Sequence, residues 1–331
     1  MINKKLKLSE NLFKRDIEKI PTRNGYGEGL VLAGEENKNV VVLCADLADS
    51  TRSSYFKEKF PKRFIEVGVA EQALATIAAG MAAYGKIPFI SSYAVFSPGR
   101  NWEQIRTTAA LNNLPVKIGG AHTGLTVGPD GATHQALEDI ALMRVMPNMV
   151  VLAPCDAIET RKAVLAASKN RKPTYIRFAR EETEVMTTED TPFEMGKAET
   201  FWESKDPKVA IIACGPLLYK AMKAAKKLMD SKIESIVINC HSIKPIDEQV
   251  VIKAAKITGA VVTVEEHQVS GGLGSAVSEV LSKNFPVPME FVGMPDAFGE
   301  SGKPKELLKK YKMTSYQINL AAKRAIRKKD N

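Results

Sequence analysis

A single carboxylate, Glu71, stands where a short apolar segment turns into a helix of small residues. Residues 64–67 are typical of a strand, and the alanine-rich residues 73–83 predict a helix that is closely packed on every face. An acid in the first helical turn is often there only because the helix dipole favours it. In such a closely packed helix, however, a carboxylate must be paired or used, because an isolated buried charge is costly. Glu71 is therefore a candidate for chemistry.

Two of the four histidines, His122 and His134, lie in one glycine-rich loop that also carries Asp130. The loop follows an apolar strand predicted at residues 116–120, and open α/β sheets bind ligands at the carboxyl ends of their strands. A lone histidine is most often a structural group, but two in one loop of this kind favour a functional role. We assign structural roles to His241 and His267, which follow strands of the second half.

Short apolar strands alternate with helices along most of the chain, which predicts the elements that position these side chains. The pattern is typical of an α/β fold with two domains, each a mostly parallel sheet covered by helices. We predict a helical lead-in over residues 1–20, a first domain over 21–180 and a second over 208–331. The acidic, threonine-rich segment 181–207, with prolines as breakers, is predicted to link them. A helix is predicted from 134 to 146, and Thr22 or Asn24 is expected to cap an earlier helix that runs to about residue 36.

The glycine cluster at residues 270–274 follows a strand and opens a helix. Its spacing does not match the dinucleotide-binding fingerprint, because Val277 stands where the third glycine is required. A Rossmann-type cofactor site is therefore not expected. An anion at the start of this helix stays an open alternative.

The composition is that of an ordinary soluble protein. Of the 331 residues, 44% are hydrophobic and 26% are charged, and no apolar run approaches the ~18–20 residues that a membrane span needs. The lysine-rich start is not followed by an apolar segment, so we expect neither a secretory signal nor a membrane partner. Widely spaced cysteines predict buried free thiols in a reducing cytoplasm, the expected location. The cysteines are Cys44, Cys155, Cys214 and Cys240.

The net charge of +9 is compatible with an anionic small-molecule substrate, and much of it lies in the C-terminal tail. No zinc-finger spacing, RNA-binding aromatic signature or basic region with heptads occurs in the sequence. Nucleic acid is therefore not an expected partner.

Several short motifs follow one another in an order that resembles a known family. They are Glu-Val-Gly-Val-Ala-Glu71-Gln, Tyr93-Ala-Val-Phe96, Ala-His122 and Gly-Pro-Asp130-Gly-Ala-Thr-His134-Gln, then Glu-Glu-His-Gln-Val-Ser-Gly-Gly-Leu-Gly and Phe298-Gly-Glu-Ser-Gly-Lys-Pro. The first four resemble the pyrimidine-binding half of transketolase, a thiamine diphosphate enzyme, and the last two are similar to its C-terminal domain. The resemblance spans roughly residues 20–328.

The resemblance implies a cofactor site. Glu71 would be the carboxyl that donates to the N1′ atom of the aminopyrimidine, and its burial would favour the protonated form. Phe96, with Tyr93, would stack on the pyrimidine ring. Asp46, at the end of the first strand, matches a family residue near the thiazole of thiamine diphosphate.

The same resemblance implies a sugar phosphate site. His122 and His134 would bond to sugar hydroxyls and assist proton transfer, and Asp130 would contact the hydroxyl next to the reacting carbon. The matches to the family's phosphate contacts are Arg23, Ser50 and Arg180. Arginine suits this task because its planar fork binds phosphate with two hydrogen bonds. From the sequence alone, solvation at the surface is the simpler role for both arginines.

Two departures from the family pattern shape the predicted function. Gly99-Arg100 stands where an additional aromatic is usual, with Trp102 nearby as a replacement. The Gly-Asp-Gly motif that holds the diphosphate and its metal occurs nowhere in the sequence. We therefore expect the C-terminal subunit of a split transketolase, with Mg²⁺ or Ca²⁺ on a separate N-terminal transketolase subunit. Self-association through the Glu71 helix would give two copies of each.

The predicted activity is transfer of a two-carbon ketol unit between sugar phosphates, part of pentose phosphate metabolism. The alternatives are a 1-deoxyxylulose-5-phosphate synthase-like subunit or a 2-oxo acid dehydrogenase β-type subunit. From another class, the chain could be a non-catalytic scaffold or regulatory partner.

Overall fold

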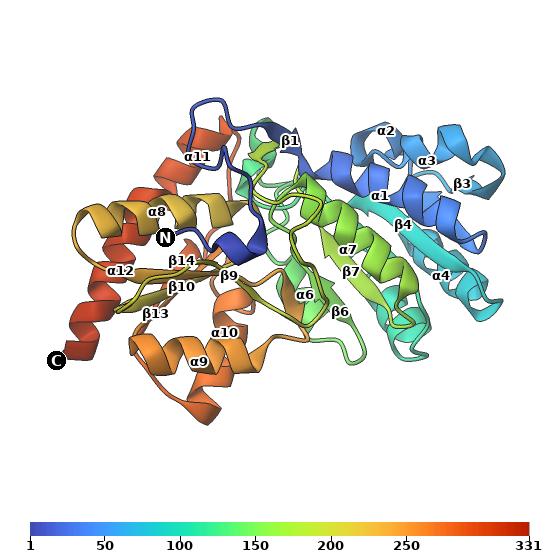
Figure 1. Ribbon diagram of the computed structural model, residues 1–331. Helices are drawn as coiled ribbons and strands as arrows, with labels where there is room; N and C mark the ends of the chain where they lie inside the picture. The colour runs from blue at the N-terminus through green and yellow to red at the C-terminus, as the bar shows by residue number, and fades with distance from the viewer. Residues whose placement is uncertain (331) are drawn as a thin grey trace.

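The computed structural model describes residues 1–330 and shows two α/β units side by side (Figure 1). The first unit contains a seven-stranded sheet in the order β12-β6-β7-β5-β4-β2-β3. All of its neighbouring strands are parallel except β12, which runs antiparallel to β6. The strands are β2 (Val40–Cys44), β3 (Phe64–Glu66), β4 (Ile87–Tyr93), β5 (Lys117–Ala121), β6 (Val150–Leu152), β7 (Thr174–Arg177) and β12 (Ser242–Lys244).

Helices cover both faces of this sheet because its strands are apolar on both. Val40 and Val42 of β2 belong to the core beneath α1 and α7, whereas Val41 and Leu43 belong to the core beneath α4. Helices α1 and α7 lie side by side in Figure 1, and Gly25 permits the contact. A Cβ added to Gly25 would lie 1.9 Å from the Ala157 carbonyl oxygen. The helical segments are α1 (Thr22–Glu36), α2 (Ala48–Thr51), α3 (Ser54–Lys59), α4 (Glu71–Ala83), α5 (Trp102–Gln104) with the π-helical turn Ile105–Ala110, α6 (Asp139–Arg144) and α7 (Ala157–Lys169).

The second unit is a five-stranded sheet in the order β14-β13-β10-β11-β9, with β9 antiparallel at one edge. Helices α8 and α12 pack on one face, and α9 and α10 pack on the other. The core under α9 and α10 is continuous with the core under α4 of the first unit, so the two units share apolar packing. The strands are β9 (Glu199–Trp202), β10 (Val209–Ala213), β11 (Ser235–Asn239), β13 (Val261–Gln268) and β14 (Met289–Met294), and the helices are α8 (Leu218–Asp230), α9 (Glu248–Thr258), α10 (Leu273–Asn284), α11 (Pro304–Lys310) and α12 (Ser315–Asp330).

The predicted helical lead-in over residues 1–20 is wrong. This segment has one turn of 3₁₀ helix (Lys4–Leu6) and ends in the strand β1 (Lys19–Pro21), which pairs with β8 (Glu182–Glu184). Leu6, Leu8 and Leu12 are buried in the core of the second unit, so burial of these side chains stabilises the irregular path of the segment over that unit in place of a regular helix. Its backbone also bonds to residue 201 of β9.

Four further local expectations differ from the structure. The helix expected from residue 134 begins only at Asp139. The preceding residues form turns of the loop that carries His122 and His134, called the histidine loop below. The segment 181–207, expected to be a simple linker, contains the strands β8 and β9. Strand β12 was not expected, and it carries part of the second half of the chain into the first sheet. Helix α1 begins at Thr22 without a side-chain cap, since the Thr22 hydroxyl accepts from the Ala179 amide instead.

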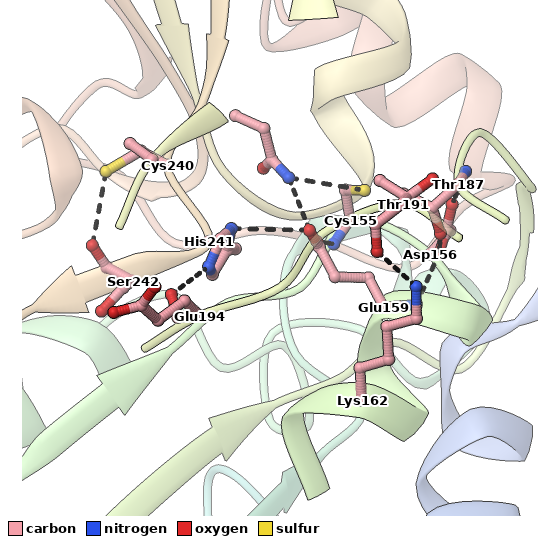
Figure 2. A network of polar contacts seen from close by, with 12 residues as sticks. Cys155, Asp156, Glu159, Lys162, Thr187, Thr191, Glu194, Cys240, His241 and Ser242 are labelled. Atoms are coloured by element: carbon pink, nitrogen blue, oxygen red, sulfur yellow. Dashed lines mark hydrogen bonds and ion pairs between the residues drawn. The ribbon is translucent and has the colours of Figure 1, made fainter. Parts of the chain in front are cut away.

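Two buried polar networks also join the units. In the first (Figure 2), the Glu159 carboxylate on α7 accepts from Asn239 Nδ2 at 2.6 Å and lies 3.5 Å from His241 Nδ1. In the second, Arg177 at the end of β7 pairs with Asp139 and donates to the Glu266 carbonyl oxygen at 2.7 Å. His241 thus has the structural role expected of it. His267 does as well, because it is fully buried and its Nε2 accepts from the Ala141 amide.

Candidate active site

The candidate residues come together at the carboxyl ends of β2, β4, β5 and β7. Tyr93 is the last residue of β4, His122 directly follows β5, and Arg180 lies three residues beyond β7. In a parallel sheet these ends share one edge, which is where α/β proteins bind ligands. The alternation of short strands and helices therefore places side chains from distant parts of the sequence at one site.

An aromatic and histidine cluster forms the middle of the site. The Tyr93 ring stacks on the His122 ring with centroids 3.9 Å apart, and Tyr93 and Phe96 are 6.1 Å apart. The His134 ring packs against both in a T-shaped arrangement, with its centroid 6.0 Å from that of Tyr93 and 5.6 Å from that of Phe96. Its Nδ1 lies 2.9 Å from the Thr133 hydroxyl, a contact that orients the imidazole. The two histidines of the loop thus face one aromatic surface.

A cationic edge borders the cluster. Arg180 Nη1 donates to the Val127 carbonyl at 3.1 Å and lies 3.4 Å from Asp130 Oδ1. Arg23 donates to the Ser50 carbonyl at 3.1 Å. Burial lowers the pKa of Arg23, and the charges of Arg52 and Arg180 add to this shift, so these cations lie near one another. Arg23 Nε is buried and has no hydrogen-bond partner among residues 1–330. A neighbouring anion would stabilise this group.

His122 is expected to remain neutral down to acidic pH. Burial lowers the pKa of its imidazole to about 3, and the nearby charges of Arg23, Arg180 and His134 act in the same direction. The pKa of an unperturbed histidine is about 6.5, so the unfolded chain binds the proton first as the pH falls. The contribution of His122 to stability is therefore fully present above about pH 6.5 and is lost as the pH falls toward 3.

NMR titration of the imidazole, in the chain without ligands, measures this pKa directly. A His122→Asn variant offers a second readout, because its urea midpoint should fall less than that of the wild type between pH 6.5 and pH 4.5. An imidazole that titrates close to the unperturbed value would contradict the expectation.

Glu71 begins α4 and is buried, with 2% of its side chain exposed. Its Oε2 pairs with Arg100 Nη1 at 2.6 Å, and the Arg100 guanidinium also lies over the Phe96 ring at 4.8 Å from the centroid. Its backbone carbonyl accepts from Asn101 Nδ2 at 2.8 Å. Arg100 thus holds the carboxylate and Asn101 holds the backbone, while Oε1 accepts no hydrogen bond from the part of the chain that the structure describes.

Arg100 is a site residue that the sequence reasoning missed. The sequence pattern shows it only as part of a gap in the aromatic wall, although its position four residues after Phe96 is a signal that the two side chains can meet. Trp102, considered as the replacement aromatic, does not take that place. Its indole donates to the Leu142 carbonyl at 2.9 Å and packs against the core of the first unit, so hydrogen bonding and burial hold it away from the ring cluster.

Asp46 is exposed, at the carboxyl end of β2, with a left-handed backbone (φ 57°) and its amide bonded to Glu66 Oε1 at 2.8 Å. Within residues 1–330 no hydrogen bond or ion pair joins its side chain to the ring cluster. The glycine cluster near residue 272 also differs from a free anion site. The Glu265 carboxylate already accepts from the amides of Leu273 and Gly274, which open α10.

No group of three or more histidine, cysteine or acidic side chains in residues 1–330 is arranged to hold a metal ion. Over the same residues, every helix is too short or too polar to cross a bilayer. All four cysteines are buried free thiols, as the sequence predicts.

Comparison with known families extends over nearly the whole chain. The transketolase pyrimidine-binding domain model matches residues 18–185, and the transketolase C-terminal domain model matches residues 177–318. A putative transketolase C-terminal section of Methanocaldococcus jannaschii is 43% identical over 299 residues, covering 89% of this chain and 93% of that protein.

Two other similar proteins carry information on assembly and substrate. A 6-deoxy-6-sulfo-D-fructose transketolase subunit of Clostridium sp. (strain MSTE9) is 37% identical over 318 residues, which is 96% of this chain and 98% of that protein. A solved structure described as a split gene transketolase, inactive beta4 tetramer, has a TM-score of 0.87 and 45% identity, covering 94% of this chain and 99% of that chain.

These matches confirm the predicted fold class, with two parallel-dominated sheets covered by helices, and the resemblance drawn from the motifs. They extend over both units in the order of the family's domains. The chain therefore belongs to the transketolase family and carries its pyrimidine-binding and C-terminal domains.

Proposed function

We propose that the chain is the C-terminal subunit of a split transketolase and binds the aminopyrimidine of thiamine diphosphate. The observation that carries the proposal is the buried Glu71 carboxylate beside the Tyr93–Phe96 surface. Two polar atoms beside these residues support the fit to the cofactor, because His122 Nδ1 and Asn101 Oδ1 are buried without a hydrogen-bond partner in residues 1–330. A polar ligand in the site could satisfy atoms of this kind.

Each side chain has a distinct task in this proposal. Thiamine diphosphate, when bound, supplies the electron sink for cleavage and formation of the ketol carbon–carbon bond. Glu71 would hold a proton at the ring nitrogen of the pyrimidine, Phe96 and Tyr93 would bind its face, and Asp46 would contact its neighbouring ring. His122, neutral at working pH, would offer hydrogen bonds to substrate hydroxyls, and His134 would assist proton transfer beside it.

The cationic edge supports an anionic substrate. Arg23 and Arg180 converge beside His122, and Ser50 and Asp130 adjoin them. Arginine binds phosphate bidentately, so a sugar phosphate suits this edge. A sulfonate presents a similar tetrahedral set of acceptor oxygens, and the similar Clostridium protein is named for a sulfo-sugar. Sugar phosphates are the first candidates, and a sulfo-sugar is the second.

An Arg180→Met variant should raise KM for the phosphorylated donor about 10- to 100-fold, because a hydrogen bond to a charged group contributes about 1.5–3 kcal/mol. The corresponding sugar without its phosphate should be turned over equally by the variant and the wild type. Steady-state kinetics with both sugars measures the difference. Equal KM values of the variant and the wild type for the phosphorylated sugar would show that Arg180 does not bind the phosphate group.

We infer that the active assembly needs an N-terminal transketolase subunit that holds the diphosphate with Mg²⁺ or Ca²⁺. The similar split proteins, matched over almost their full lengths, support this inference. Exposed apolar side chains on and beside α4 support self-association there, and an assembly of two copies of each subunit follows. These side chains are Val69, Ile77 and Tyr84. The expected location is the cytoplasm.

The direct test is ketol transfer from xylulose 5-phosphate to ribose 5-phosphate in the presence of thiamine diphosphate and Mg²⁺. The chain is assayed alone and with the candidate N-terminal subunit from the same source. Activity in the mixture only is the expected result. Activity of the chain alone would contradict the split arrangement. No turnover by a mixture that binds the cofactor would point to the sulfo-sugar, or to a synthase-like or dehydrogenase-like role.

A further inference from the structure

The histidine loop is hydrogen-bonded to residues of the C-terminal domain. The 3₁₀ turn Leu125–Asp130 lies between His122 and His134 in the loop. The amide of Thr126 in this turn donates to Glu266 Oε1, from β13, at 2.6 Å. Gln135, at the end of the loop, donates to the Glu300 carbonyl at 2.9 Å. The turn and the end of the loop are therefore each bonded to the other domain.

The backbone of the loop is adapted to this contact. Gly124 has a left-handed φ of 84°, and a Cβ there would lie 2.4 Å from Glu266 Oε1. His122 also has a positive φ, 54°, which is uncommon for a residue with a side chain. Backbone of this kind persists only where surrounding contacts hold it. The Glu266 carboxylate is one such contact.

Glu266 is itself fixed in place. Its residue is 3% exposed, and its carbonyl oxygen accepts from Arg177 Nη2 at 2.7 Å. Arg177 is bonded in turn to Asp139 of α6. The backbone of Glu266 is thus part of β13 and is also bonded to Arg177 of the first domain, and its carboxylate accepts from the loop.

We propose that Glu266 is a positioning residue, through which the C-terminal domain sets the geometry of the histidine loop and hence of His122 and His134. It contacts the loop backbone rather than any group that faces the site. This gives the C-terminal domain a defined role in the first domain's chemistry. The kinetic consequence rests on the proposed function, whereas the effect on the loop does not.

Hydrogen–deuterium exchange on the free chain tests the structural part without any substrate. In Glu266→Ala, the loop peptide that contains Thr126 should exchange at least about tenfold faster than in the wild type, because its amide loses its acceptor. Glu266→Gln keeps an acceptor oxygen and should restore most of the protection. Glu266→Asp keeps the charge but moves the carboxylate oxygen away from the Thr126 amide. In this variant the loop peptide should also exchange faster than in the wild type, so it serves as the test if the alanine variant does not fold.

Glu159→Ala is the matched control. Glu159 is equally buried and also bridges the two domains, but its partners are Asn239 and His241 rather than the loop (Figure 2). This variant should leave loop exchange unchanged. Equal loosening of the loop in both variants, or unchanged exchange in Glu266→Ala and Glu266→Asp, would overturn the proposal.

In the assembled enzyme, Glu266→Ala should raise KM for the donor sugar about tenfold or more, with the Kd for thiamine diphosphate unchanged. Glu266→Gln should recover most of this loss. A KM that stays at the wild-type value although the loop exchanges faster would overturn the claim that the contact positions the histidines. If the wild-type assembly turns over no sugar, the proposed function fails, while the exchange result still decides whether Glu266 holds the loop.

Discussion

Replacing Glu71 by alanine is expected to lower ketol transfer by the assembled enzyme about 10²- to 10⁴-fold, the range for loss of a positioned proton-transfer group. The physical reason is the position of this carboxylate. It lies buried at the start of α4, close to the aromatic surface through the Arg100 guanidinium that contacts both. The measurement is kcat with saturating cofactor and partner subunit.

The control for this variant is Glu103→Ala, which removes an exposed carboxylate from α5 and should leave kcat unchanged. Glu71→Ala should still fold, because the Arg100 side chain that loses its partner is 48% exposed and can be solvated. Circular dichroism and the urea midpoint check this. Wild-type activity in Glu71→Ala would instead favour the non-catalytic scaffold or regulatory subunit.

Arg100 introduces a specific question about this carboxylate. A guanidinium 2.6 Å from Oε2 occupies one oxygen of the group that is proposed to hold a proton for the cofactor. The other oxygen, Oε1, is therefore the one available for that task. An Arg100→Met variant should keep cofactor-dependent activity if Oε1 alone serves, and measurement of kcat in parallel with Glu71→Ala separates the two roles.

The parts of the fold that the sequence could predict are those governed by local periodicity. The apolar strand at residues 40–44 and the small-residue helix after Glu71 have the expected bounds to within one or two residues. The right-handed connections of a parallel sheet then bring His122 and Tyr93 to one edge, with no further information needed. A parallel sheet of this kind needs only short-range signals to be recognised.

The features that escaped prediction depend on contacts between distant segments. Leu6 and Leu12 look like part of one helix, but they bury against the second domain from a short 3₁₀ helix and a run of turns. Strand β12 is too short to stand out, and it forms only because β6 offers a free edge. The link between Glu266 and Thr126 joins residues 140 positions apart, and no local pattern reveals such a pair.

An Asp139→Ala variant is expected to lose about 3–5 kcal/mol of unfolding free energy, because it leaves a buried guanidinium without its counterion. Asp139 accepts from Arg177 Nε at 2.8 Å and from the Tyr175 hydroxyl at 2.7 Å, all at buried positions. Urea unfolding at neutral pH measures the change. The control is Glu279→Ala, which removes the exposed partner of Arg144 and should cost at most about 1 kcal/mol.

The double variant Asp139→Ala with Arg177→Met separates two explanations of this loss. If the unpaired charge is the cause, the double variant should be more stable than Asp139→Ala alone, since a buried pair removed as a whole costs far less than a pair that is broken. It would nevertheless lack the bond from Arg177 to the Glu266 carbonyl, which helps to fix the position of Glu266 against the histidine loop. A double variant that regains stability but exchanges the loop amides faster than the wild type would show that this ion pair is retained for the geometry of the site rather than for the free energy of folding. An additive loss in the double variant would contradict the account of the buried charge.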